Sequence, residues 1–433
     1  MRGAGGGAGG LPVAPVKKRA PGVVLAMLLL VYSFNFLDRQ IVSILAAPIK
    51  AEFALSDKQL GLLGGLAFAI LYSTMGIPLA WLADRTRRSW VITGSLAVWS
   101  AFTALCGVAG NFTQLLLFRV GVGVGEAGGV APSYALIGEI YPANRRARAL
   151  AIYSLGIPIG SALGVLFGGY VAALVNWRAA FLWVGLAGMA VAPIFALIVR
   201  DPPRPAARAD EPGIGHVFAI LAAKPSFWLL ACGAASSSML GYGLAFWLPS
   251  LLRRSFELDL PATGRFFAGL ALIGGTIGMF AGGWIADRLG EREKGAYARV
   301  PAVAFLAAAP LYAAGVLSHS PLAAFLLLLI PQGLAYVWLG PVLAAVQHLV
   351  PPAMRATASA CFLTINNLIG VGFGALAIGT LSDALAPRLG EEALRWAIVA
   401  SLGFYVVAGL LMLLASRHLA RDWVQPLSES AVS

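Results

Sequence analysis

The sequence predicts an all-α integral membrane protein with twelve transmembrane helices in two pseudo-symmetric six-helix halves. Of the 433 residues, 59% are hydrophobic and 12% are charged, whereas soluble domains carry about 25% charged residues. Apolar segments of roughly 20 residues recur along the chain, each long enough to cross a bilayer. A loop motif occurs once in each half. Such long segments form helices, because backbone polar groups in lipid must be paired within the segment.

The apolar segments define the order of the expected elements. Twelve spans are expected at about residues 22–47, 60–82, 90–109, 113–139, 148–174, 178–199, 226–251, 264–286, 299–318, 321–349, 357–382 and 393–416. The longest central break is rich in proline and arginine and separates six spans from six. We therefore expect a disordered cytoplasmic tail (1–20), an N-terminal half (21–200), a cytoplasmic linker (201–224), a C-terminal half (225–417) and a second cytoplasmic tail (418–433).

The basic residues predict the orientation of the chain in the membrane. If both termini are cytoplasmic, 21 of the 31 Lys and Arg residues lie on the inner side and 8 on the outer side. Cytoplasmic loops carry such an excess of basic residues. We therefore expect a multi-pass protein of the plasma or inner membrane. The net charge of +12 reflects this topology, and no nucleic-acid partner is expected.

The repeated loop motif follows spans 2 and 8, at equivalent positions in the two halves. It reads Ala80-x-x-x-Asp84-Arg85-Thr86-Arg87-Arg88 in the first half and Gly283-x-x-x-Asp287-Arg288-Leu289-Gly290-Glu291-Arg292 in the second. A topological loop would explain the arginines but not an aspartate repeated at the same offset. We expect a cytoplasmic gate whose acid–base pairs close the inner side in the outward-open state. Its candidates are Asp84, Arg85, Arg88, Asp287, Arg288 and Arg292.

Four charged residues lie inside apolar spans, which is costly and typical of functional positions. Asp38 and Glu126 are candidate proton carriers, because a carboxyl group can bind a proton in an apolar cavity and release it beside an arginine. The alternative is a fixed structural ion pair. Arg119, two helical turns before Glu126, suits a phosphate or carboxylate, or a salt bridge to Asp38. Arg39 points about 100° away from Asp38 on a helix. It either takes part in substrate binding or coupling, or contacts a neighbouring helix.

Polar residues in other spans are candidates for lining a central cavity. The two amides in span 11 require partners at that depth, and Pro331 and Pro341 are expected to soften span 10. Four glycines at four-residue spacing in span 5, from Gly156 to Gly168, predict close helix packing. The candidate lining residues are Asn35, Tyr153, Asn366, Asn367, Gln332 and Tyr336.

The loop motif resembles the G-x-x-x-D-R-x-G-R-R signature of the major facilitator superfamily. In the first copy Ala80 and Arg87 replace the two glycines, so the helices are expected to approach less closely there. Arg119-x-x-x-Gly123-x-Gly125 resembles a second signature. Asn35-Phe36-Leu37-Asp38-Arg39, Gly123-Val124-Gly125-Glu126-Ala127 and Ile378-Gly379-Thr380-Leu381-Ser382-Asp383 resemble the spinster-type branch. Its eukaryotic members are associated with lysophospholipids and sphingosine phosphate. The anion:cation symporter branch shares the span 1 and span 4 residues.

The resemblance implies a secondary active, proton-coupled transporter that works by alternating access. We expect an amphiphilic anionic solute such as a lysophospholipid or sphingoid lipid; the alternative is a small hydrophilic organic anion. No nucleophile–base pair, metal set or phosphate loop is present, so neither enzyme activity nor a metal is expected, and no cofactor besides the proton gradient. The expected partners are the bilayer, the solute and protons, and the expected state is a monomer.

Overall fold

The computed structural model describes residues 20–202, 214–290, 292–351 and 354–424. Residues 1–19 and 425–433 of the expected tails and residues 203–213 of the expected linker therefore lie outside the described residues. Within them the chain is helical and has no strand. Eleven segments of the described residues are long and apolar enough to cross a membrane, and the last of these, Thr357–Asp422, covers the last two expected spans. The twelve expected spans thus each correspond to a helical segment.

The N-terminal half contains three uninterrupted long helices and three interrupted ones. Spans 2, 4 and 5 are each divided in two, and the division in span 4 follows directly after Glu126. The helices of this half are α1 (Pro21–Phe53), α2 (Asp57–Gly64), α3 (Leu66–Arg85), α4 (Arg88–Cys106), α5 (Phe112–Glu126), α6 (Val130–Ile140), α7 (Ala143–Ser154), α8 (Gly156–Leu174) and α9 (Trp177–Ile198).

The C-terminal half follows the short helix α10 (Ile214–Ala222) and also has six spans, of which spans 8, 10 and 12 are interrupted. Span 8 contains a π-helical turn, and span 10 is interrupted after Pro331, as the proline predicts. Its helices are α11 (Pro225–Ser255), α12 (Leu260–Gly269), η1 (Leu270–Gly275), α13 (Thr276–Gly290), α14 (Ala296–Leu317), α15 (Pro321–Leu334), α16 (Leu339–Gln347), α17 (Arg355–Leu389), η3 (Gly390–Glu392), α18 (Ala393–Ser401) and α19 (Gly403–Asp422).

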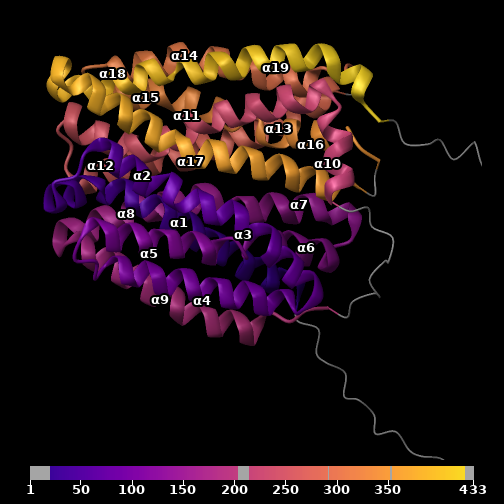
Figure 1. The fold of residues 1–433 in the computed structure, drawn as a ribbon, viewed down its shortest axis with the longest axis horizontal. Helices are drawn as coiled ribbons and strands as arrows, with labels where there is room; N and C mark the ends of the chain where they lie inside the picture. Colours follow the sequence, from indigo (N-terminus) through magenta and orange to yellow (C-terminus); the bar gives the residue numbers. More distant parts are fainter. Residues whose placement is uncertain (1–19, 203–213, 291, 352–353, 425–433) are drawn as a thin grey trace, which may run out of the picture.

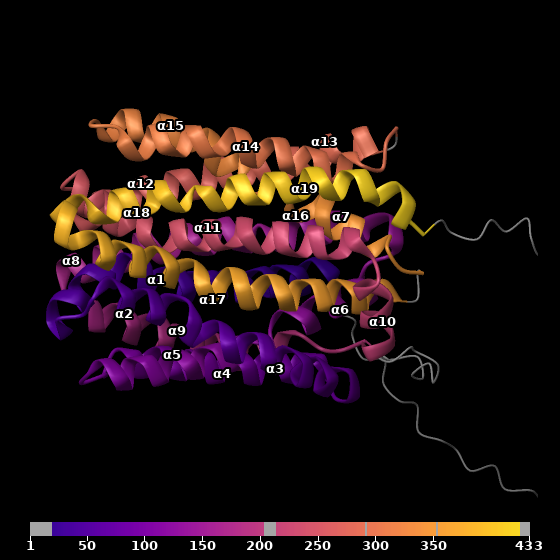
Figure 2. The same cartoon turned by 45° about the horizontal axis from the view of Figure 1, so that its top comes forward.

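Helix pairing is equivalent in the two halves. In the N-terminal half α1 packs on α8 and α4 on α9, and in the C-terminal half α11 packs on α17 and α14 on α19. The halves meet where α2 packs on α17, α8 on α12 and α1 on α11. Figures 1 and 2 show the two halves as separate layers, indigo to magenta and rose to yellow. This is the arrangement that duplicated transporter halves adopt around a midplane site.

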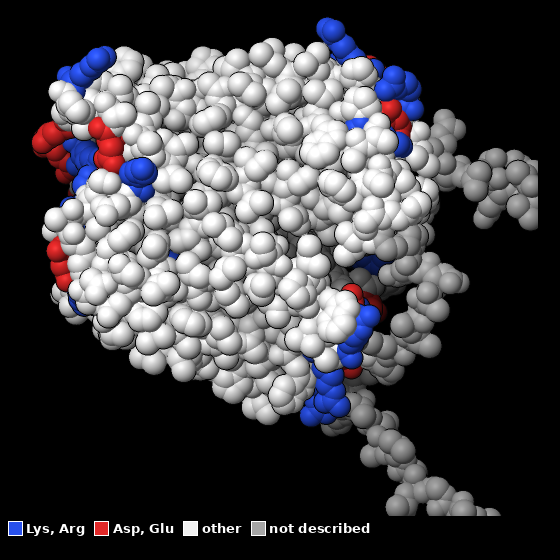
Figure 3. All heavy atoms as spheres, viewed as in Figure 1, with Lys and Arg blue, Asp and Glu red and all other residues white. Residues whose placement is uncertain are grey.

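Both ends of the described chain lie at one end of the bundle (Figure 1). We call the end where α1 begins and α19 finishes the tail end, and the opposite end the loop end. Figure 3 shows Lys, Arg, Asp and Glu gathered near these two ends, with a broad uncharged band between them. An apolar band between two charged rims is the surface that a bilayer requires.

Glycines on α8 set the position of α1, which carries the first two intramembrane charges. A Cβ atom on Gly160 would lie 2.2 Å from the Ser33 carbonyl oxygen, and one on Gly164 would lie 2.6 Å from that of Leu37. The predicted close packing is therefore confirmed, and only glycine permits this approach. It holds residues 33 to 40 of α1 firmly against α8.

Candidate functional site

The four intramembrane charges form two ion pairs between α1 and α5. Arg119 Nη1 lies 3.3 Å from Asp38 Oδ1, and Arg39 Nε lies 2.7 Å from Glu126 Oε2. Each pair joins one residue of α1 to one of α5. Asp38 therefore pairs with Arg119, as the salt-bridge alternative predicts. Glu126 pairs with Arg39, the residue that follows Asp38 in the sequence.

The Asp38–Arg119 pair lies inside the N-terminal half. Each of these residues is only 1% exposed. The Thr103 hydroxyl on α4 donates a hydrogen bond to the second carboxylate oxygen of Asp38. Both charges are paired and buried, and together with Thr103 the pair connects α1, α4 and α5.

The Arg39–Glu126 pair lies at the edge of this interior. The Glu126 side chain is fully buried, whereas that of Arg39 is 12% exposed. The Arg39 guanidinium lies over the rings of Phe68 and Tyr72 on α3, at 4.7 Å and 4.5 Å from their centroids. Aromatic faces stabilise a cation in this position. Of the four charges, Arg39 has the most exposed side chain.

Several polar atoms near this pair lack hydrogen-bond partners among the described residues. They include Arg39 Nη2, Glu126 Oε1 and both amide atoms of Asn35, which precedes Arg39 by one helical turn. Asn35 is 2% exposed. Buried polar atoms without partners are costly, so this region is suited to a polar ligand or water. Tyr153 lies nearby and stacks on Tyr32, with ring centroids 4.3 Å apart.

The predicted cavity residues of the C-terminal half are polar but neutral. Asn366 accepts a hydrogen bond of 2.9 Å from Ser238, and its amide nitrogen lies 3.5 Å from Asn367 Oδ1. Gln332 accepts a hydrogen bond of 2.9 Å from Tyr312. Tyr336 is half-buried and packs beside Gly275. The charged residues of α11 to α19 lie toward helix ends, so, of the side chains that the structure describes, those of the N-terminal half bring charge to the midplane.

The predicted gate residues make contacts within their own halves. Arg88 pairs with Asp84, at 3.2 Å, and with Glu139 of α6. The Arg85 guanidinium stacks on Trp81 at 4.0 Å from the ring centroid. In the second copy, Arg288 lies 5.5 Å from the Trp284 ring, and Arg292 is exposed. The side chain of Asp287 lies outside the described part of the structure.

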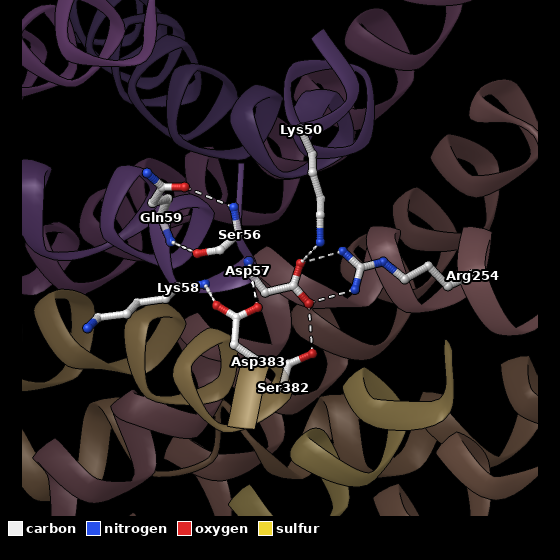
Figure 4. Close-up of polar contacts among 8 residues, drawn as sticks. All are labelled: Lys50, Ser56, Asp57, Lys58, Gln59, Arg254, Ser382 and Asp383. Carbon is white, nitrogen blue, oxygen red and sulfur yellow. Dashed lines mark hydrogen bonds and ion pairs between the residues drawn. The ribbon is translucent and has the colours of Figure 1, made fainter. Parts of the chain in front are cut away.

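An ion-pair cluster at the loop end, which the sequence does not predict, joins the two halves (Figure 4). Asp57 of α2 is 3% exposed. Arg254 of α11 donates two hydrogen bonds of 2.7 Å to its carboxylate. Ser382 of α17 donates a third, also 2.7 Å, and Lys50 of α1 pairs with the same carboxylate. Four helices from both halves thus meet on one buried charge.

The neighbouring aspartate of α17 strengthens this cluster. Asp383 accepts hydrogen bonds from the backbone amides of Asp57 and Lys58, at 3.0 Å and 2.8 Å. These amides lie in the first turn of α2, where amides lack partners within the helix and the helix dipole favours an anion. Ser56 and Gln59 cap the same turn through a capping box. We call Lys50, Asp57, Arg254, Ser382 and Asp383 the loop-end lock.

The sequence offered two signals for members of the lock. Ser382 and Asp383 stand in a motif that resembles the spinster-type branch, and the start of α2 is marked locally. Ser56 followed by Gln59 indicates a helix start, which places Asp57 in a first turn. Its main partner is 197 residues away, and spacing in the sequence does not reveal such a pair. In the sequence, Lys50 and Arg254 do not differ from the other basic residues expected on the outer side.

Two further contacts join the halves toward the loop end. Gln40 of α1 donates a hydrogen bond of 2.6 Å to the Ala245 carbonyl of α11. Arg265 of α12 donates one of 2.9 Å to the Tyr170 hydroxyl of α8. At the tail end, Figure 3 shows the surface hollowed between the halves. Among the described residues, the polar contacts that join the halves thus lie toward the loop end, whereas the face in Figure 3 is hollowed between the halves at the tail end.

Known proteins are similar to this chain in sequence and in fold. Residues 28–375 match the Major Facilitator Superfamily. The chain is 33% identical to an MFS-type efflux pump of Mycolicibacterium smegmatis, over 93% of this chain and 94% of that protein. It is 29% identical to protein spinster homolog 1 of Homo sapiens, over 84% of this chain and 73% of that protein.

A solved structure is also similar to this chain. A bacterial homolog of the human lysosomal transporter spinster, in an inward-facing and unoccupied conformation, superposes with a TM-score of 0.84 at 33% identity. The match covers 95% of this chain and all of that one. The chain therefore belongs to the Major Facilitator Superfamily and is a multi-pass, spinster-like membrane transporter.

Proposed function

We propose that this transporter moves an amphiphilic anionic solute, such as a lysophospholipid or sphingoid lipid, by proton-coupled alternating access. The observation that carries the proposal is the uneven charge at the midplane. The N-terminal half offers a partly exposed guanidinium with an unpaired nitrogen, and the facing half offers neutral side chains. An anionic headgroup fits the first surface, and the second surface places no charge beside an apolar tail.

Competition for Arg39 couples the solute to a proton. A phosphate or carboxylate that binds the guanidinium takes the place of Glu126. The planar guanidinium of Arg39 presents a fork of N–H donors that can bind two oxygens of either anion. Glu126 is then a buried carboxylate without its cation, and it binds a proton instead. When the solute leaves, Arg39 and Glu126 pair again and the proton is released. The burial of Arg119 favours Arg39 as the residue that contacts the solute.

The two ends of the bundle then act as alternate gates. We infer from the basic loops that the tail end is cytoplasmic, so the observed arrangement corresponds to an inward-facing state. The loop-end lock holds the outer side closed. In the opposite state the lock separates, and the Asp84 and Asp287 loops close the tail end. The inward-facing relative supports this assignment.

Transport by reconstituted protein tests the solute class. Proteoliposomes with an imposed pH gradient are supplied with a labelled lysophospholipid or, separately, with labelled small organic anions. We expect gradient-driven movement of the lysophospholipid that unlabelled lysophospholipid inhibits. Movement of a small dicarboxylate but not of the lysolipid would overturn the amphiphile and favour the alternative solute. The buried amides Asn35 and Asn366 would then be its natural partners.

A further inference from the structure

A groove on the outer surface of the N-terminal half lies apart from the proposed solute site. It has a volume of about 670 Å³ and runs between α3, α4 and α5. Leu79, Leu82, Val91 and Val98 form its walls. Leu82 is 39% and Val98 41% exposed on the outside of the bundle. The groove therefore opens toward the hydrocarbon of the membrane.

Two glycines create the space. Gly94 of α4 and Gly125 of α5 both line the groove. A Cβ atom on Gly94 would meet nothing within 4 Å, whereas one on Gly125 would lie 2.5 Å from the Trp99 backbone nitrogen. Gly125 thus brings α5 close to α4 as the floor, and Gly94 leaves the groove open above it.

The tail-end mouth of the groove is cationic. Arg87 lines it and is exposed, and this arginine stands where the family signature has glycine. Among the described residues Arg87 has no ion-pair partner, whereas its neighbour Arg88 pairs with Asp84 and Glu139. Trp90, also in the lining, is 68% exposed, as is typical of tryptophan at a membrane interface.

We propose that this groove binds an anionic phospholipid of the leaflet at the tail end. The phosphate lies on Arg87, and one acyl chain lies between α3 and α4 as far as Gly125. The charge of the mouth favours an anionic headgroup over a zwitterionic one, because a basic residue at the membrane surface attracts anionic lipid. The groove meets α5 one residue before Glu126, so its occupant packs against the helix that carries this carboxylate.

Native mass spectrometry of the full-length, delipidated protein tests the proposal. The protein is titrated with phosphatidylglycerol and with phosphatidylcholine of identical acyl chains. We expect wild-type protein to retain one phosphatidylglycerol in preference to phosphatidylcholine. Arg87→Gln weakens phosphatidylglycerol binding about fivefold, which corresponds to the attraction of about 1 kcal/mol that one basic residue contributes. It weakens phosphatidylcholine binding less, because the choline cation offsets the charge of the phosphate. Arg87→Lys retains the preference.

A second variant tests the groove itself. Gly94→Leu fills open space without displacing the backbone, so it weakens the binding of both lipids while the protein stays folded. Two matched controls lie away from the groove. Arg417→Gln removes another exposed tail-end arginine, and Gly403→Leu adds the same bulk at an exposed glycine whose Cβ would also meet nothing within 4 Å. Both controls bind phosphatidylglycerol like wild type.

Four results of these binding measurements would overturn the proposal. Equal binding of the two lipids by wild-type protein overturns the proposal, as does an unchanged lipid preference in Arg87→Gln or unchanged binding in Gly94→Leu. Loss of the preference in Arg417→Gln would also overturn it, because the effect would then be general to basic residues. The readout is lipid binding, so it does not depend on the proposed transport activity.

Discussion

Asp38 and Arg39 are adjacent in the sequence yet occupy different environments. Successive residues on a helix point about 100° apart, so Asp38 faces α4 and α5 while Arg39 faces the aromatic rings of α3. The sequence predicted that both charges are intramembrane and that Asp38 has Arg119 within reach. It left open which arginine is accessible, because that depends on the rotation of α1, which close packing on α8 determines.

At this scale, Arg39 is the first residue to test. Arg39→Gln removes the cation from the edge of the cavity, and we expect solute affinity to fall at least about tenfold, the value of one charge-assisted hydrogen bond of roughly 1.5 kcal/mol. Arg39→Lys keeps the charge without the fork and gives an intermediate affinity. Scintillation proximity binding of labelled lysophospholipid measures both. Wild-type affinity in Arg39→Gln would exclude Arg39 from the solute site.

The sealed pair gives a different prediction. Asp38→Asn leaves Arg119 buried without its counter-ion, which destabilises a protein by about 3–5 kcal/mol. We therefore expect a clear fall in melting temperature in detergent. Thr103→Val removes one neutral donor and serves as the milder comparison. If Asp38→Asn melted like wild type but lost coupling, Asp38 would act as a proton carrier instead of a structural charge.

At the scale of elements, the apolar spans were predictable and the contacts between them were not. The span expected near 22–47 is observed as α1, Pro21–Phe53, because apolar length and hydrogen bonding in lipid determine a helix by themselves. The loop-end lock depends instead on how α2, α11 and α17 are placed. Asp57 and Arg254 carry no local sign of each other, so only the assembled halves reveal the pair.

The lock predicts a change in the balance between conformations. Asp57→Asn removes the carboxylate that Arg254 and Lys50 share. The loss destabilises the inward-open state by about 1.5–3 kcal/mol, the value of hydrogen bonds to a charged group. The outward-open population then rises roughly ten- to hundredfold relative to the inward-open one. Glu52→Gln is the matched control, because its partner Arg178 lies at the same end but in the same half.

Distances between spin labels measure this balance. One label pair on Thr113 and Glu391 reports on the loop end, and another on Arg145 and Arg417 reports on the tail end; all four positions are exposed. The three native cysteines are first replaced by alanine. In Asp57→Asn we expect longer loop-end and shorter tail-end distances. Equal distributions in Asp57→Asn and Glu52→Gln would show that the lock does not set the conformation.

At the scale of the whole molecule, two similar halves carry unlike charge. The N-terminal half supplies all four midplane charges, and the C-terminal half supplies amides and aromatic rings. Alternating access moves these surfaces relative to each other, so the charged half can keep the headgroup while the other half releases the tail. The duplicated loop motif revealed the six-plus-six plan from sequence, whereas the separation at the tail end is a property of the assembled molecule.

Proton movement in Glu126→Gln tests the central claim most directly, that Arg39 exchanges a solute anion for the Glu126 carboxylate. In proteoliposomes with an internal pH dye, wild-type protein should move protons together with the lysophospholipid. Glu126→Gln should still exchange labelled for unlabelled solute, because Arg39 stays available, but should move no protons and ignore the pH gradient. Solute-dependent proton movement at the wild-type rate in Glu126→Gln would contradict the account.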